Sequence, residues 1–184
     1  MKSKFLDARE KYDGAQLVSL NSYLKHGLLG DSVVAWVGPC DVSFEHMVDG
    51  EDLLAKAVIA GDLMLHFIIE KFDISLFAAV GLQRLFASIV RDQLQAQGAT
   101  GLTRDGDDIW QGERKLSISI ATQSPVSSLI HFAVNITNEG TPVKTLSLTD
   151  LKIEPKAFAL KAMELFCREI QGIQDATQKV RWVK

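Results

Sequence analysis

Cysteine is scarce in this chain of 184 residues. Its two cysteines, Cys40 and Cys167, stand far apart and in no paired spacing. Such spacing argues against a disulfide framework and against a zinc site built from thiolates. A reducing compartment suits a chain of this kind, and we expect the protein to be cytoplasmic.

Long apolar runs and an excess of charge of one sign are also missing. No run approaches the roughly 20 residues that a membrane-spanning helix needs, and the charged start has no apolar core of signal-peptide length. The formal net charge of -3 gives no overall attraction to nucleic acid or to an anionic membrane. We therefore expect neither nucleic acid nor a membrane as a partner; the polar strand face described below indicates a small-molecule ligand.

The chain contains only four prolines, spread singly, and no repeat or linker interrupts it. Hydrophobic residues make up 47% of the sequence, which is enough to bury a substantial core. We expect a single domain over residues 1–184.

Apolar periodicity predicts helices over residues 14–27 and 75–97, and a final helix that begins near Pro155. Residues 45–57 are ambiguous. The expected strands cover residues 32–37, 62–71, 101–104, 108–111, 115–121 and 129–136. Gly38-Pro39 should end the first of them, as a turn that either reverses the chain or faces a ligand with its N–H groups. This order predicts an α+β fold with an antiparallel or mixed sheet backed by helices.

The last two strands alternate polar and apolar residues. Apolar side chains at 116, 118 and 120, and at 130, 132, 134 and 136, would face the core. The polar side chains would then share one surface: Lys115, Ser117, Ser119, His131 and Asn135. A cation, an imidazole, an amide and two hydroxyls suit the polarisation of a carbonyl, or the binding of a phosphate or carboxylate. A sheet with one solvated face has the same alternation.

Three carboxylates precede the lysine, at Asp105, Asp107 and Asp108. They would fix its ammonium group or bind a magnesium ion coordinated by substrate phosphates, or simply form a charged turn. The four histidines, at 26, 46, 66 and 131, have no metal-ligand spacing, so we expect no metal site. His66 has the setting of a satisfied, half-buried imidazole, and Cys40 that of a small buried thiol.

The segments GDDIWQGERKLSIS and LIHFAVNI resemble the part of the biotin- and lipoate-protein ligase superfamily that carries its catalytic lysine. Asp107-Asp108-Ile109, Gly112 and Lys115-Leu116 follow the order seen in biotin ligases, and His131-Phe132 resembles the His-Gly of lipoate ligases. Nearly the whole chain also resembles an uncharacterised archaeal and bacterial domain-of-unknown-function family in this fold superfamily, which is class II aminoacyl-tRNA synthetase-like. The segments YDGAQL, LLGDSVVAWVGPCDV, DLMLHF and SPVSSLIHFAVNI carry that second resemblance.

The resemblance implies a biotin/lipoate protein ligase-like sheet, with Lys115 touching an acyl carbonyl or an acyl-adenylate phosphate and His131 beside it as the catalytic pair. The resemblance and the shared polar surface together suggest five further residues for the substrate site: Ser117, Ser119, Asn135, Asp108 and His66. ATP and magnesium are the cofactors that it suggests, and the strand edges and helices leave room for a homodimer.

Three features of the ligases and the related octanoyltransferases are missing from this sequence. Residues 48–72 contain neither the Gly/Arg-rich loop of biotin ligases nor the Gly-Gly-Gly strand of lipoate ligases. Residues 137–150 do not contain the cysteine nucleophile that octanoyltransferases use. The sequence thus leaves two readings open. One is a ligase or acyltransferase that carries out acyl or adenylyl transfer; the other is a non-catalytic member of the scaffold that binds a ligand or a protein partner.

Overall fold

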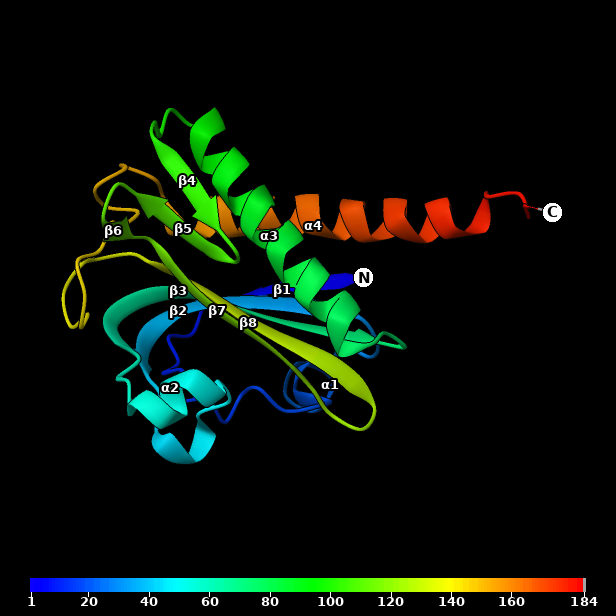
Figure 1. Cartoon of the computed structure of the whole chain (residues 1–184), viewed down its shortest axis with the longest axis horizontal. Coiled ribbons are helices and arrows are strands. Elements are labelled where there is room, and N and C mark those ends of the chain that lie inside the picture. Colours follow the sequence, from blue (N-terminus) through cyan, green and yellow to red (C-terminus); the bar gives the residue numbers. More distant parts are fainter. Residues whose placement is uncertain (184) are drawn as a thin grey trace.

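The computed structural model describes residues 1–183, which form a five-stranded sheet, a smaller three-stranded sheet and helices around them (Figure 1). The helices are α1 (Asn21–His26), α2 (Gly50–Ala55), α3 (Leu76–Ala96) and α4 (Pro155–Gln178), with a 3-10 turn η1 (Phe44–His46). The strands are β1 (Lys2–Leu6), β2 (Ser32–Asp41), β3 (Ala60–Phe72), β4 (Leu102–Asp105), β5 (Asp108–Gln111), β6 (Arg114–Lys115), β7 (Ser117–Gln123) and β8 (Ser127–Asn135).

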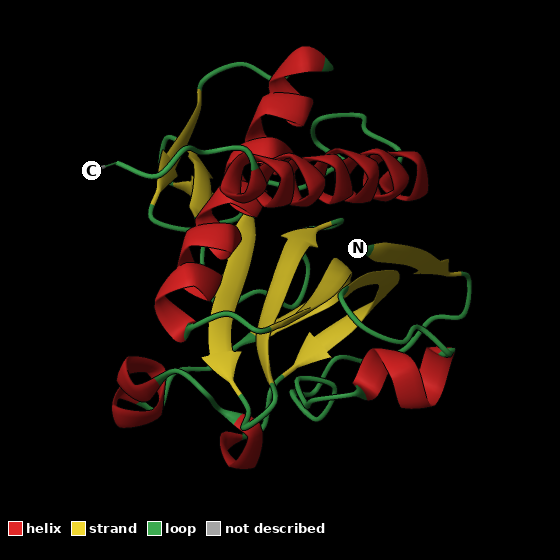
Figure 2. Cartoon of the chain, turned by 90° about the vertical axis from the view of Figure 1, so that its right-hand side faces the viewer, coloured by secondary structure: helices red, strands yellow, loops and turns green. Residues whose placement is uncertain are grey.

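The large sheet has the order β1-β2-β3-β8-β7. β1 runs parallel to β2 and the other neighbours are antiparallel, so the sheet is mixed. Helix α3 packs over β7 and β8, and α4 over β1 and β2, so both long helices cover the same face (Figure 2). The fold is the expected α+β class, with a sheet backed by helices.

The main core lies between this sheet face and the two long helices. Phe86 of α3 sits at its centre, with its ring edge-on to the rings of Phe67, Phe132 and Phe166 at centroid distances of 5.0, 5.2 and 5.1 Å. All four rings are fully buried. Such edge-to-face contacts add to the hydrophobic gain of burial and fix the angle at which the helices cross the sheet.

The opposite face of the sheet is covered as well. A second apolar cluster forms there around Tyr12, Trp36, Met64 and Ile68, where the N-terminal segment crosses the strands. Both faces of the large sheet are therefore lined with apolar side chains, and this determines which polar residues reach the candidate site.

Two expectations about local structure are wrong. β2 does not stop at Gly38-Pro39 but continues to Asp41, with a register shift between Gly38 and Cys40. Proline has no N–H to donate, and it is tolerated at such a bulge because the extra residue there forms no ladder hydrogen bond. The first helix is also shorter than predicted, because Leu20 adopts a left-handed backbone (φ 64°) and only Asn21–His26 are helical.

Candidate functional site

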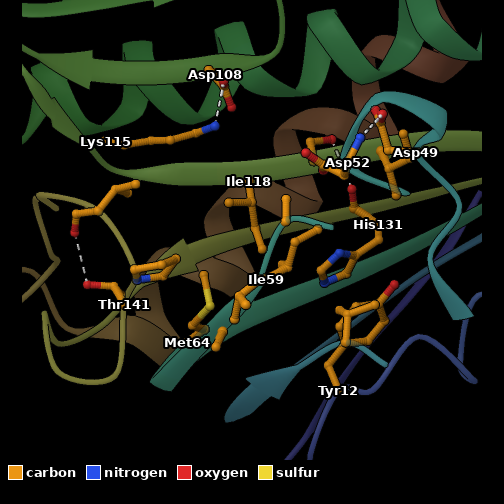
Figure 3. A pocket seen from close by; sticks show the side chains of 18 of the residues that line it. Tyr12, Asp49, Asp52, Ile59, Met64, Asp108, Lys115, Ile118, His131 and Thr141 are labelled. Atoms are coloured by element: carbon orange, nitrogen blue, oxygen red, sulfur yellow. Dashed lines mark hydrogen bonds and ion pairs between the residues drawn. The ribbon is translucent and has the colours of Figure 1, made fainter. Parts of the chain in front are cut away.

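A pocket of about 510 Å³ opens on the sheet face away from α3 and α4. Its floor comes from β3, β8 and β7, with the side chains Met64, Ile118, Ile120, His131 and Asn135. Its walls are the excursion between β2 and β3, which carries η1 and α2, the β5–β6 hairpin and the loop at residues 141–145. Figure 3 shows Lys115 and Asp108 on one side of this space, Tyr12 and His131 on another, and Met64, Ile118 and Ile59 between them.

The cationic end of the pocket is the Lys115–Asp108 pair. The lysine Nζ lies 2.7 Å from a carboxylate oxygen of Asp108, and both side chains are about one quarter exposed. The same ammonium lies 5.4 Å from the centroid of the Trp110 ring. Ion pair and aromatic face together hold the ammonium at the pocket wall, and an ammonium with three N–H groups keeps donors for a ligand.

Carboxylates outnumber cations in the described lining. Lys115 is its only lysine or arginine, whereas four aspartates contribute: Asp49, Asp52, Asp107 and Asp108. Burial raises the pKa of Asp107, and Gln83 Nε2 donates to its carboxylate at 2.7 Å. Asp49 caps α2 by accepting from the N–H groups of Glu51 and Asp52. The pocket therefore carries a negative field around a single, paired ammonium group.

A pair of buried imidazoles forms the second polar end. His66 Nε2 lies 3.1 Å from the carbonyl oxygen of Gly38, and His66 Nδ1 lies 3.1 Å from Nε2 of His131. The Tyr12 ring stacks on His131 with a centroid distance of 3.6 Å and an interplanar angle of 12°. Burial lowers the pKa of His66 to about 4 and that of His131 well below its ordinary value, so both rings are neutral at neutral pH.

In the described part of the chain, no group of three or more histidine, cysteine or acidic side chains is placed to hold a metal ion. No helix there is long and apolar enough to cross a membrane.

The family model of a domain of unknown function, DUF366, matches residues 1–181. The chain belongs to the DUF366 family. An uncharacterised protein of Methanocaldococcus jannaschii is 29% identical to this DUF366 chain over 182 residues, which are 95% of this chain and 82% of that protein. A protein of unknown function from Pyrococcus horikoshi is 38% identical, with a TM-score of 0.95, and the match covers 100% of this chain and 99% of that one.

Solved structures of lower sequence identity show which known fold the chain has. A biotin protein ligase mutant from Aquifex aeolicus, in complex with biotin, has a TM-score of 0.62 at 11% identity, over 95% of this chain and 72% of that chain. A lipoate-protein ligase A bound with ATP has a TM-score of 0.55 at 14% identity, over 92% and 85%. The DUF366 chain therefore has the biotin/lipoate protein ligase-like scaffold that the sequence resemblance implied.

The DUF366 structure brings together only part of the predicted polar surface. Lys115, Asp108, His131 and Asn135 all line the pocket. The amide of Asn135 does not stay free for a ligand, since it donates to the backbone carbonyls of Lys115 and Leu146 at 3.1 and 3.3 Å. It holds the end of β8 against the strand that carries the lysine.

The expected position of Ser117 and Ser119 beside His131 is wrong. In the β7–β8 register Ser119 faces Phe132, while Ile120 faces His131, and directly paired residues point to the same side of a sheet. The Ser119 hydroxyl accepts from Gln83 of α3 at 2.9 Å and donates to the carbonyl of His131 at 2.9 Å. It reaches only the edge of the pocket, where Ser119 is among the lining residues.

The side chain of Ser117 is fully buried and accepts from the Ile109 N–H at 3.0 Å. The prediction from alternation failed because both faces of the sheet are apolar. Ile118 and Ile120 line the pocket, whereas on the other face Ser117 contacts β5 and Ser119 contacts α3. Among the predicted site residues, His66 reaches the pocket only through His131, and it is fully buried rather than half-buried. Asp105 is not among the lining residues.

Several lining residues escaped the sequence reasoning. Tyr12 comes from an irregular segment with no periodic pattern, and the ambiguous stretch at residues 45–57 supplies a pocket wall. Trp110 could have been predicted from the sequence, because it lies two residues after Asp108 in a short strand that pairs with the strand of Lys115. No local pattern in the sequence places Tyr12 on the ring of His131.

Proposed function

We propose that this pocket binds a small acyl compound, R–CO–X, and transfers the acyl group to a nucleophile of a second substrate; the new bond to the acyl carbon forms, the C–X bond breaks, and X leaves with the proton of the nucleophile. The acyl carbonyl accepts a hydrogen bond from the Lys115 ammonium, and the chain lies along Met64, Ile118 and Ile120. The observation that carries the proposal is the half-buried Lys115–Asp108 pair at the end of an apolar floor. An ammonium group fixed there would stabilise the negative charge that develops on a carbonyl oxygen during acyl transfer.

The charge balance favours a neutral acyl group over a free anion. Asp108 already neutralises Lys115, and a carboxylate ligand would have to compete with it in the field of Asp49, Asp52 and Asp107. A carbonyl oxygen needs one N–H donor and leaves the ion pair intact.

The same lining does not fit ATP with magnesium, which the fold family suggests. A triphosphate needs several cations or a glycine-rich loop of N–H groups. The described lining offers one lysine, already paired, and no group of three or more potential metal ligands. We therefore assign no adenylation step to these residues.

A second candidate function is ligand binding without turnover. It is favoured by the lack of an activated nucleophile among the described lining residues. They include no cysteine, burial raises the pKa of the Tyr12 hydroxyl, and the hydroxyls of Ser119, Thr141 and Thr145 are all hydrogen-bonded to protein groups. Acyl transfer would then require an acceptor that comes with a second substrate. For either function, we propose that the protein acts in the cytoplasm.

A thermal-shift screen of the full chain tests the binding step. We expect N-methyloctanamide, a neutral acyl compound, to raise the melting temperature more than octanoate, and ATP with magnesium to have no effect. A ligand at a hundredfold excess over its Kd stabilises the folded state by about 2.7 kcal/mol, a shift that such a screen resolves. A larger shift with ATP than with the amide would replace this proposal by nucleotide binding.

A further inference from the structure

The hydrogen bonds of the histidine pair fix which nitrogen carries each proton. The carbonyl oxygen of Gly38 can only accept, so the neighbouring Nε2 of His66 must donate to it. A neutral His66 then has a lone pair on Nδ1, and this atom accepts from Nε2–H of His131 at 3.1 Å. His131 is therefore held with its proton on Nε2 and a lone pair on Nδ1.

That lone pair remains available to a ligand. In residues 1–183, Nδ1 of His131 has no hydrogen-bond partner in the protein. The atom still has accessible surface, unlike the unpartnered atoms that are completely buried. His131 is only 3% exposed and lines the pocket. The Tyr12 hydroxyl also lacks a hydrogen-bond partner in the described chain. Tyr12 is 3% exposed and lines the same pocket. Unused polar atoms at a buried pocket floor point to a ligand that satisfies them.

The ring of His131 cannot rotate to offer a donor instead. Tyr12 stacks on one of its faces at 3.6 Å, and a flip would break the bond to His66. Gly38, which begins this chain of bonds, is held in place because the backbone of Glu10 passes directly over it. The acceptor is thus preorganised by β2, β3 and the N-terminal segment together.

We infer that His131 determines ligand specificity: the pocket selects an acyl compound that carries an N–H or O–H donor at its far end, which binds Nδ1 of His131. This inference rests on the proposed function, because it takes the acyl carbonyl to lie at Lys115. Asn135, beside the lysine strand, and His131 lie four residues apart on β8, a separation of about 13 Å along a strand. An extended chain of eight carbons is about 9 Å long, and a hydrogen bond of about 3 Å at each end extends its reach to about 13–15 Å.

Three probes test the selection: the N-methylamides of octanoic, 8-hydroxyoctanoic and 8-methoxyoctanoic acid. The hydroxyl donates to Nδ1, whereas the methoxy oxygen can only accept and would face a lone pair. A buried polar atom left without its partner weakens binding, so we expect the hydroxy probe to bind roughly tenfold more tightly than the methoxy probe. Equal affinities for the two would overturn the inference and leave the proposed function standing.

Two variants at His66 separate this positioning role from a general effect on the fold. In His66→Gln the amide group can donate to Gly38 and accept from His131, so the tenfold preference should persist. In His66→Leu the proton of His131 is no longer held on Nε2, so the preference should fall to about one while both probes still bind. An unchanged preference in His66→Leu would contradict the assignment.

Nitrogen-15 NMR of the histidine side chains reports the tautomer without any ligand. We expect both His66 and His131 of the wild-type protein to carry the proton on Nε2 at pH 7. A proton on Nδ1 of His131 would overturn the inference, even if His66→Leu fails to fold. If none of the three probes binds, the proposed acyl site is wrong, and this measurement alone decides whether His131 presents an acceptor.

Discussion

The two buried histidines make the folded protein sensitive to acid. The pKa of His66 is lowered to about 4 by burial, whereas histidine in the unfolded chain titrates near 6.5. Below pH 6.5 the unfolded state therefore binds a proton that the folded state does not. The stability is fully present above pH 6.5 and is lost as the pH falls toward 4, by about 2 kcal/mol from His66 alone between pH 7 and 5.

Urea unfolding at pH 7, 6 and 5 measures this loss, with two variants for comparison. His66→Gln should show a flatter profile, because the group that titrates has been removed. His46→Gln, at a histidine outside the buried pair, should keep the wild-type profile. If His66→Gln loses as much stability as the wild type over this range, the pair is not the source of the acid sensitivity.

At the residue scale, the sequence best predicted the positions of polar residues that stand out from their neighbours. A lysine after a run of aspartates and a histidine in an apolar strand both pointed to this region, and the structure places Lys115 and His131 in one pocket. The serines could not be placed correctly, because their orientation depends on the elements packed against β7, which are α3 at Ser119 and β5 at Ser117. Tyr12 could not be found, because its partner lies more than a hundred residues away in the sequence.

At the scale of elements, the tight crossing of β2 and the N-terminal segment is the least tolerant feature. A Cβ atom at Gly38 would lie 1.8 Å from the carbonyl oxygen of Glu10. We expect Gly38→Ala to lower the free energy of unfolding by at least about 2 kcal/mol, because Gly38 is paired with Met64 in the sheet and the carbonyl of Glu10 accepts a hydrogen bond from the Trp36 indole N–H.

Gly81 of α3 provides the matched control. It lies in a helix with open space around the position of a Cβ atom, so Gly81→Ala should raise the stability by up to about 1 kcal/mol. Denaturant unfolding of both variants compares the two sites. Similar small effects at both positions would mean that the crossing at Gly38 is looser than the structure describes.

The elements with strong internal signals were predicted correctly. The long helix α3, the start of α4 at Pro155 and the buried strand β3 follow from apolar period, a first-turn proline and a bulky apolar run. The errors came where tertiary contacts override a local preference: beyond the expected stop at Gly38-Pro39, β2 exchanges backbone hydrogen bonds with Tyr12 through Pro39 and Asp41, and it stays paired with β3.

On the scale of the whole molecule, the end of α4 projects away from the body (Figure 1). Residues 171–183 are all exposed, whereas Phe166 packs in the core. We expect removal of residues 174–184 to leave the melting temperature within about 2 °C of the full chain, because surface groups contribute little. Phe166→Ala should instead cost about 3–5 kcal/mol; a large loss on truncation would show that the projecting turns bind another part of the protein or a second copy.

We also propose that the protein forms a homodimer through the apolar side chains around α1. Leu24 and Leu29 are 75% and 60% exposed, and Val18 is 52% exposed, which is a large apolar surface for a segment of this length. Light scattering after size exclusion should give twice the mass of 20.3 kDa for the wild type and the monomer mass for Leu24→Lys. A monomeric wild type at micromolar concentration would contradict this.

The most direct test of the acyl site is a calorimetric titration of N-methyloctanamide into the wild type, Lys115→Met and Lys144→Met. Methionine keeps the stem of lysine and removes its N–H donors, and Lys144 is an exposed lysine beside the same strand, paired with Glu113. Asp108→Asn combined with Lys115→Met keeps the pocket charge unchanged. We predict that binding is weakened at least tenfold in both Lys115 variants and unchanged in Lys144→Met; equal affinity in all four proteins would contradict a carbonyl bound at Lys115.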